Sequence, residues 1–168
     1  MPARQENPGV EPTRLKVREA QSEDVPAIER LIGQHWPVNL DYRKEVSNGD
    51  AVFLIADANS GSTRSRLELL GVALMWVTRW NKTGYLVELA VDKAHKRMGV
   101  GSALLKALAE RAKEKGLRAI IVETQPDSKE AMDFYLRSGL RLCGFNDRYY
   151  TNKPVNSHQI AVFFSLDL

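Results

Sequence analysis

The chain has 168 residues, of which 43% are hydrophobic and 27% charged, a composition typical of one globular domain with a substantial core. It has no apolar run long enough to span a bilayer. The first residues carry charges and prolines without the apolar centre of a secretory signal. We therefore expect a flexible leader over residues 1–14, a single domain over 15–168, and no membrane association. The single cysteine, Cys143, excludes an intrachain disulfide and is typical of a reducing cytoplasm.

The net charge of +3 is unevenly distributed along the chain. Residues 92–118 contain eight basic and three acidic residues, and residues 123–135 contain four acidic residues and one lysine. A basic segment followed by an acidic one is typical of solvated helix faces, or of an anionic ligand bound beside a cationic one.

Periodicity and turn residues predict the elements in chain order. They are a strand (15–20), a helix (22–36), a loop or short helix (37–50), strands (51–58, 67–80 and 85–91), a helix (100–115), a strand (118–125), a helix (127–139), and two final strands (140–150 and 158–168). Residues 59–66 and 152–157 have the composition of loops. This order predicts one α+β domain, with a central, mixed but mostly antiparallel sheet flanked by about four helices.

Local signals mark the ends of several predicted helices. Gly116 and Gly139 follow apolar helical stretches, where a left-handed residue commonly ends a helix. Asp127 and Glu130 have the spacing of a capping box. In the helix at 100–115, a stripe of Val100, Leu104, Leu108 and Ala112 predicts one buried face.

Residues 92–105, DKAHKRMGVGSALL, place basic residues and two glycines before an apolar helix. The first N–H groups of a helix lack backbone partners and lie at the positive end of the helix dipole, so they favour an anion. Gly99 and Gly101 lack a Cβ, which lets a large anion approach the main chain, and Lys96 and Arg97 add positive charge. The segment suits a phosphate or diphosphate, or equally a glycine-rich helix entry with solvent-facing lysines.

The pattern LAV-x7-GVG-x2-LL, followed by a strand and A-x2-FY-x3-G, resembles the GNAT superfamily of acetyl-CoA-dependent N-acetyltransferases over about residues 15–168. Within it, the sequence is most similar to streptothricin and related antibiotic acetyltransferases, or to ribosomal-protein N-terminal acetyltransferases. The family signature, Gln/Arg-x-x-Gly-x-Gly/Ala, begins with a lysine here, which keeps the charge and loses the planar contacts of arginine.

The resemblance implies a GNAT-like fold with acetyl-CoA as co-substrate. Main-chain N–H groups after the basic loop would hold its diphosphate, and the preceding strand would hold its pantetheine arm. Ser128 stands where the family often has a cofactor-binding asparagine. The cofactor-binding residues implied are Leu89, Ala90, Val91, Lys96, Arg97, Met98, Gly99, Val100, Gly101, Ser102 and Ser128.

Acetyl transfer to an amine requires a base for the ammonium proton, with a pKa of about 10.4, and an acid for the departing thiolate, with a pKa of about 8.5. Tyr135 can donate a proton at neutral pH, and it can equally be a core aromatic residue. The family pattern FY-x3-G, matched by Phe134 to Gly139, implies that Tyr135 protonates the thiolate.

Two acidic residues interrupt apolar strands and are candidates for the base. Glu88 lies in YLVELAV, on the face predicted for Leu86 and Ala90, and Glu123 ends AIIV, on the face of Ile121. A carboxylate in an apolar strand needs a partner, a solvated edge or a task. The sequence does not distinguish between the two.

We expect direct attack by a primary amine in a ternary complex, with an oxyanion donor among the N–H groups of Leu89 to Val91. Residues 35–37, 41–42 and 146–150 are candidates for contact with the acceptor. The acceptor is an amine-bearing small molecule, or alternatively a protein N-terminus or lysine. A non-catalytic CoA-binding protein or a nucleic-acid-associated module are alternatives of another class.

The histidines and the single cysteine lack metal-ligand spacing, so we expect no metal. We also expect no nucleic-acid partner, because no aromatic ladder accompanies the basic segment. A homodimer is consistent with the resemblance.

Overall fold

The computed structural model describes residues 14–59, 68–153 and 159–168. Its seven strands are β1 (Arg14–Glu19), β2 (Ala51–Asn59), β3 (Glu68–Thr78), β4 (Thr83–Val91), β5 (Ala119–Thr124), β6 (Arg141–Asn146) and β7 (Ala161–Asp167). Its α-helices are α1 (Val25–Ile32), α2 (Tyr42–Val46), α3 (Val100–Glu114) and α4 (Lys129–Arg137), and the 3₁₀ turns are η1 (Ser22–Asp24) and η2 (Lys93–His95).

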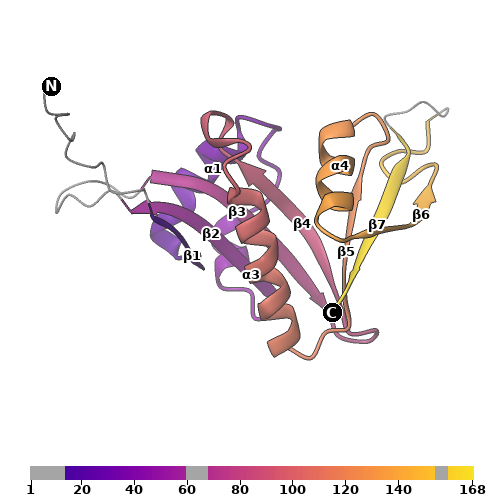
Figure 1. The fold of residues 1–168 in the computed structure, drawn as a ribbon, viewed down its shortest axis with the longest axis horizontal. Helices are drawn as coiled ribbons and strands as arrows, with labels where there is room; N and C mark the ends of the chain where they lie inside the picture. The colour runs from indigo at the N-terminus through magenta and orange to yellow at the C-terminus, as the bar shows by residue number, and fades with distance from the viewer. Residues whose placement is uncertain (1–13, 60–67, 154–158) are drawn as a thin grey trace, which may run out of the picture.

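One sheet of seven strands organises the chain, in the order β1-β2-β3-β4-β5-β7-β6. Among the described strands only the β4–β5 pair is parallel, so the prediction of a mixed, mostly antiparallel sheet with four helices is confirmed. Helices α3 and α4 lie on one face of the sheet (Figure 1). Helices α1 and α2 pack against a second apolar core on the other face. Strand β3, between these layers, is buried on both faces, as expected for a central strand.

The sheet divides between β4 and β5. The two strands pair only through Thr83–Leu86 and Ala119–Val122, at one end of each strand. Beyond this point they diverge, as Figure 1 shows above the C-terminus. In the part of the chain that the structure describes, the second half of β4, residues 87–91, therefore has a strand neighbour on one side only, which is β3.

A β-bulge changes the direction of the side chains in the second half of β4. Leu86 pairs with Met75, and Glu88 pairs with the adjacent Leu74, which leaves Val87 as an extra residue. Leu86 consequently packs in the α3–α4 core, whereas Ala90 packs in the α1–α2 core. The prediction that Glu88 shares a face with both was wrong for Leu86, because strict alternation ends at the bulge.

The helix predicted over 22–36 is divided into η1 and α1 and ends at Ile32. After it, the N–H groups of Gln34 and His35 bond to carbonyls three residues earlier, and the chain leaves the helix as a tight turn. The N-cap of α4 is Ser128, one residue after the predicted Asp127, and the Ser128 side chain makes no capping bond. Gly116 and Gly139 do follow α3 and α4 with φ of +70° and +86°.

The predicted buried stripe of α3 is confirmed, since Val100, Leu104, Leu108 and Ala112 are all buried. The predicted leader lies outside the described residues except for Arg14, which begins β1. Most of the loop predicted over 59–66 and part of that over 152–157 also lie outside them.

Candidate active site

The start of α3 has the geometry expected of an anion site. Gly99 is the N-cap of the helix with φ +83°, and a Cβ added there would meet no atom within 4 Å. Arg97 also has a positive φ, +63°. Gly99 has no side chain that could cap the first turn, and the N–H groups from Val100 to Ser102 have no backbone partner within the helix. The backbone therefore presents donors toward open space at the predicted position.

The start of α3 lies close to both neighbouring walls of the divided sheet. A Cβ added to Gly101 would lie 3.5 Å from the ring of Phe134 in α4 and 3.6 Å from Cγ2 of Val91 in β4. Gly71 in β3 allows this position, because a Cβ there would lie only 2.9 Å from Val100 and Leu104. The structure thus brings the glycine loop, the end of β4 and the helix of Tyr135 together.

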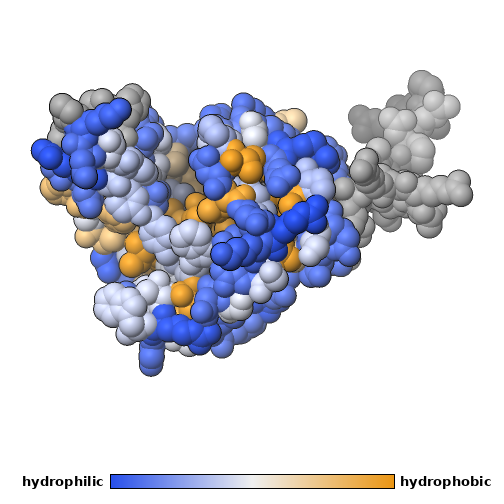
Figure 2. Space-filling model, turned by 180° about the vertical axis from the view of Figure 1, so that it is seen from behind, coloured by the Kyte–Doolittle hydropathy of each residue, from blue (hydrophilic) through white to orange (hydrophobic). Residues whose placement is uncertain are grey.

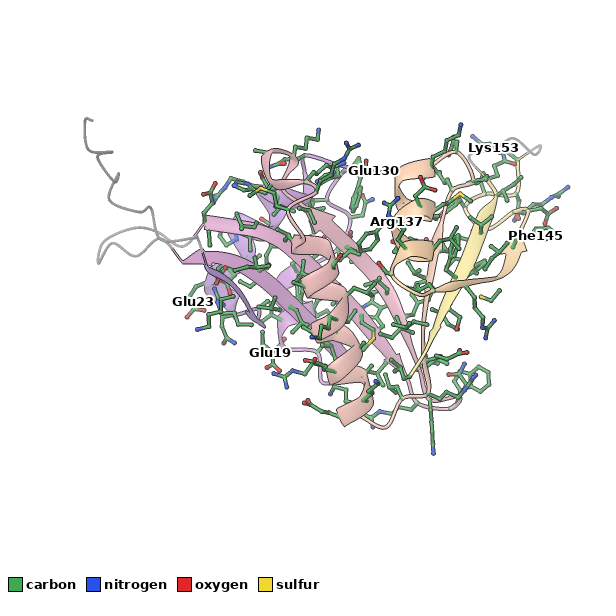
Figure 3. All side chains as sticks on the ribbon, viewed as in Figure 1. Glu19, Glu23, Glu130, Arg137, Phe145 and Lys153 are labelled. Atoms are coloured by element: carbon green, nitrogen blue, oxygen red, sulfur yellow. The ribbon has the colours of Figure 1, made fainter. Side chains whose placement is uncertain are left out.

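Lys96, predicted to contact the diphosphate, makes an ion pair across this region. Its Nζ lies 2.9 Å from Oε2 of Glu130, in the first turn of α4. Glu130 lies at the start of α4, beside the loop that precedes α3 (Figure 3). The hydrogen bond from Lys96, together with its positive charge, lowers the pKa of Glu130. The lysine predicted to contact the phosphates is therefore paired with a carboxylate of α4.

The predicted pantetheine-binding strand has backbone groups directed away from β3. The N–H of Asp92 bonds to the carbonyl of Leu70. Because peptide groups alternate in direction along an antiparallel strand, those of Leu89 and Val91 point to the side where β4 has no strand neighbour. The peptide groups of Ala90 belong to the ladder with β3 by the same alternation. The Val91 carbonyl accepts a hydrogen bond from Nε2 of His35, at 2.8 Å.

Tyr135 is buried in the core between α4 and the sheet. Its ring contacts Phe134 and Phe164 at centroid distances of 5.5 and 5.7 Å. Burial raises the pKa of its hydroxyl, and the negative charge of Glu123 raises it further. Among the described residues its hydroxyl has no hydrogen-bond partner. The structure thus keeps a protonated phenol beside the point where the sheet divides.

Glu88 is buried, and both of its carboxylate oxygens are occupied. Oε1 accepts from the hydroxyl of Tyr42 and Oε2 accepts from Nε1 of Trp36, both at 3.0 Å. Burial raises the pKa of Glu88; the two hydrogen bonds oppose this shift, and the charge of Glu123 adds to it. Glu88 therefore holds aromatic side chains from the α1–α2 region in place.

Glu123 is half-buried and surrounded by tyrosines. Oε2 accepts from Tyr85 at 2.6 Å and Oε1 accepts from Tyr150 at 3.2 Å. Tyr85 also contacts the hydroxyl of Tyr149 at 2.5 Å, and Tyr149 packs edge-on against Phe163. Tyr85, which bonds to Glu123, is paired with Ile121 in the parallel register of β4 and β5. Glu123 therefore lies on the same face of the sheet as Ile121, which is the face predicted for it.

Figure 2 views the side of α1 and α2, where the surface is hollowed between the two halves of the molecule.

Several residues of this site were not predicted from the sequence. Tyr85 is one, although a hydroxyl in an otherwise apolar strand is a pattern that indicates a polar contact. Gln34 is another: its side chain bonds to Asp92 at 2.8 Å and to the N–H of Lys93 at 3.1 Å. Tyr42, proposed as an acceptor contact, is fully buried, so its contact with Glu88 replaces that role.

Within the part of the chain that the structure describes, no helix is both long and apolar enough to cross a membrane. Within the same residues, His, Cys, Asp and Glu side chains do not gather in threes as metal ligands.

The divided sheet and the glycine-rich start of α3 form the arrangement that the sequence resemblance implies for an acyl-CoA-dependent transferase. The chain belongs to the acetyltransferase (GNAT) family, whose model matches residues 17–140.

Three comparisons illustrate the relationship. Streptothricin acetyltransferase A of Bacillus subtilis is 31% identical over 87 residues, which are 52% of this chain and 50% of the relative. An N-alpha-acetyltransferase of Sulfurisphaera tokodaii is 24% identical over 144 residues, covering 82% of this chain and 86% of the relative. A Bacillus anthracis protein assigned as a streptothricin acetyltransferase, solved with acetyl coenzyme A, superposes with a TM-score of 0.73 at 18% identity, covering 92% and 100% of the two chains. The chain thus spans about half the length of the streptothricin relative.

Proposed function

We propose that this protein transfers an acetyl group from acetyl-CoA to a primary amine by direct attack in a ternary complex. The observation that carries the proposal is the arrangement around the division of the sheet. Tyr135 lies on the α4 face, Glu123 lies on the opposite face, and the uncapped start of α3 lies at the open end. Membership of the family supports the same reaction.

The two faces separate the substrates. CoA would enter from the side of α3 and α4, with its diphosphate on the N–H groups of Met98 to Ser102 and the charges of Lys96 and Arg97. Its pantetheine arm would lie along the free edge of β4, where Leu89 offers its N–H and carbonyl and Val91 offers its N–H, since the Val91 carbonyl accepts from His35. The side chain of Ser128, which is not engaged as a helix cap, would provide a further contact. The amine would approach from the side of α1 and α2.

In this proposal Glu123 is the base and Tyr135 is the acid. Both carboxylates accept two hydrogen bonds, but Glu123 is half-buried beside the exposed Tyr149 and Tyr150, whereas Glu88 is buried. A base must be able to reach the proton it removes, directly or through one water molecule. Glu88 would then position the acceptor wall around Trp36. A main-chain N–H of Leu89 or Val91 would stabilise the oxyanion.

The acceptor we propose is an amine-bearing small molecule, with a protein N-terminus as the second candidate. The B. subtilis relative is a streptothricin acetyltransferase, which supports the first. The S. tokodaii relative, which aligns over most of both chains, is an N-alpha-acetyltransferase and supports the second. A protein lysine would be acetylated by the same chemistry, because its side chain also carries a primary amine.

Thiol release from acetyl-CoA, measured across a panel of acceptors, tests the proposal. The panel contains streptothricin-type and aminoglycoside antibiotics, polyamines, N-terminal peptides and lysine peptides. We expect release with one class above the rate without acceptor, and mass spectrometry should find the product 42 Da heavier, as roughly expected for one acetyl group replacing a proton on the amine. Thiol release without an acetylated product would contradict the proposal. So would the absence of thiol release with every acceptor while CoA still binds, which would favour a non-catalytic CoA-binding protein.

The proposal also includes a cytoplasmic location, supported by the single exposed cysteine.

The proposal includes a homodimer as well, which the edge strand β6 supports. All residues of β6 are exposed, and Leu142 and Phe145 are 59% and 75% exposed. Phe145 lies at the outer margin of the molecule (Figure 3). Light scattering should give twice the 18.9 kDa chain mass, and a Phe145→Lys variant should be monomeric.

A further inference from the structure

Three successive residues after α1 each bond to β4 or to the segment that follows it. The side-chain amide of Gln34 bonds to Asp92 and Lys93, Nε2 of His35 bonds to the Val91 carbonyl, and Nε1 of Trp36 bonds to Glu88. All these contacts fall on the half of β4 that has no partner in β5, or just beyond it. The connection after α1 therefore replaces part of the support that a neighbouring strand would give.

We propose that Gln34 is a positioning residue that sets the backbone of β4 and of the following loop for CoA, a role that rests on the proposed function. Its side-chain amide both donates and accepts a hydrogen bond. Nε2 donates to Oδ2 of Asp92 at 2.8 Å, and Oε1 accepts from the N–H of Lys93 at 3.1 Å. The orientation of the amide is thus fixed, because a flip would place donor against donor and acceptor against acceptor.

Asp92 passes this orientation on to the loop before α3. Its other oxygen, Oδ1, accepts from the N–H of Ala94 at 2.9 Å and contacts Nδ1 of His95 at 2.8 Å. These contacts shape η2, which leads directly into the residues proposed for the diphosphate. Of the two oxygens of Asp92, Gln34 bonds to Oδ2, whereas Oδ1 bonds within the loop to Ala94 and His95.

The same segment ends at the acceptor side, because the ring of His35 lies 5.3 Å from that of Trp36, which bonds to Glu88. One short connection thereby fixes the CoA-binding edge of β4 and the wall proposed for the amine relative to each other. Displacement of Gln34 is expected to weaken CoA binding while leaving the reacting groups unchanged.

A polarity swap tests this role. Gln34→Glu keeps the acceptor for Lys93 and places a carboxylate against Asp92. Asp92→Asn keeps Oδ1 and places an amide donor against the donor of Gln34. Each single variant should weaken the binding of CoA, measured by calorimetry, about tenfold, with kcat at saturating acetyl-CoA within twofold. The double variant restores one donor facing one acceptor, and its Kd should return to within about threefold of the original.

Asn39→Ala is the control, since it removes an exposed amide from the same connection. It should leave the Kd for CoA unchanged. Additive losses in the double variant, or unchanged binding in both single variants, would overturn the positioning role. Absence of CoA binding by the unmodified protein would instead contradict the proposed function, so the two failures can be distinguished.

Discussion

Lys96 and Glu130 form an ion pair between the loop before α3 and the first turn of α4, with Nζ and Oε2 2.9 Å apart. The pair joins the two helices that border the proposed CoA entrance, and both side chains are substantially exposed. An incoming diphosphate would compete with the carboxylate for the lysine. Because an exposed ion pair contributes little free energy, this competition is weak and reversible.

Replacement of Glu130 by glutamine should therefore tighten CoA binding. The lysine loses its carboxylate partner in the free protein and keeps its charge for the phosphates, so we expect the Kd to fall by up to about fivefold. Calorimetry at low salt measures the change, which should shrink as salt is added. Asp133→Asn removes an equal charge from an exposed position on the same helix and should change the Kd less. An equal effect of both variants would indicate a general change in charge.

Gly99 and Gly116 allow a matched comparison of two left-handed glycines. Their φ values are +83° and +70°, and a Cβ at either would meet no atom within 4 Å. Alanine at each should destabilise the fold by about 1 kcal/mol through backbone strain. Only Gly99→Ala should also weaken CoA binding, since its Cβ would occupy the space before the first N–H groups of α3. Thermal unfolding and calorimetry separate the two effects. Equal CoA affinity in both variants would contradict the diphosphate site.

Tyr135→Phe should lower kcat about 100-fold, because proton donation to the thiolate is lost. The ring, which packs against Phe134 and Phe164, is retained. The hydroxyl has no partner among the described residues, so the melting temperature and the Kd for CoA should change little. Steady-state kinetics with the acceptor found in the panel measures the effect. A variant with full activity would remove the acid role.

Glu123→Gln should lower kcat/KM at least about 100-fold at neutral pH, because the ammonium group loses its base. The deficit should narrow as the pH rises toward the amine pKa of about 10.4, since more of the amine is then already deprotonated. A pH profile of both proteins tests this. Glu68→Gln, at an exposed position at the start of β3, serves as the control. A deficit that is constant across the pH range would point to a structural role for Glu123.

Glu88→Gln should alter how stability depends on pH. Burial raises the pKa of Glu88 in the folded protein, so the folded state binds this proton more tightly than the unfolded chain, whose glutamates titrate at about 4.3. The contribution of Glu88 to stability is therefore fully present below that value and is lost as the pH rises through the raised pKa. The difference in melting temperature, variant minus original, should become more favourable between about pH 4 and neutral pH. A difference that falls over this range would contradict the sign of the shift.

Some features of the fold depend on residues within a few positions of one another, and these could be predicted. The glycine-rich start of α3 is one, because an N-cap with positive φ and free N–H groups follow from Gly99 and the helix after it. The apolar stripe of α3 is another, since Leu104 and Leu108 repeat with the helical period. The order of strands and helices followed from the same local patterns.

Other features required the packing of segments far apart in the sequence. The bulge at Val87 turns Glu88 away from the face of Leu86, and it arises from the fit of β4 to β3. The partners of the two carboxylates come from residues 38 to 52 positions away, apart from Tyr150 at 27.

The sequence by itself determined that a helix with exposed N–H groups follows a basic loop, and that a tyrosine and two glutamates are available for chemistry. Only the tertiary structure decided which glutamate is buried and which is half-buried beside exposed tyrosines, and that Gln34 bonds to the segment after β4. The physical reason is that periodicity and capping depend on one or two turns of chain. Burial and hydrogen-bond geometry depend instead on which distant elements the sheet brings into contact.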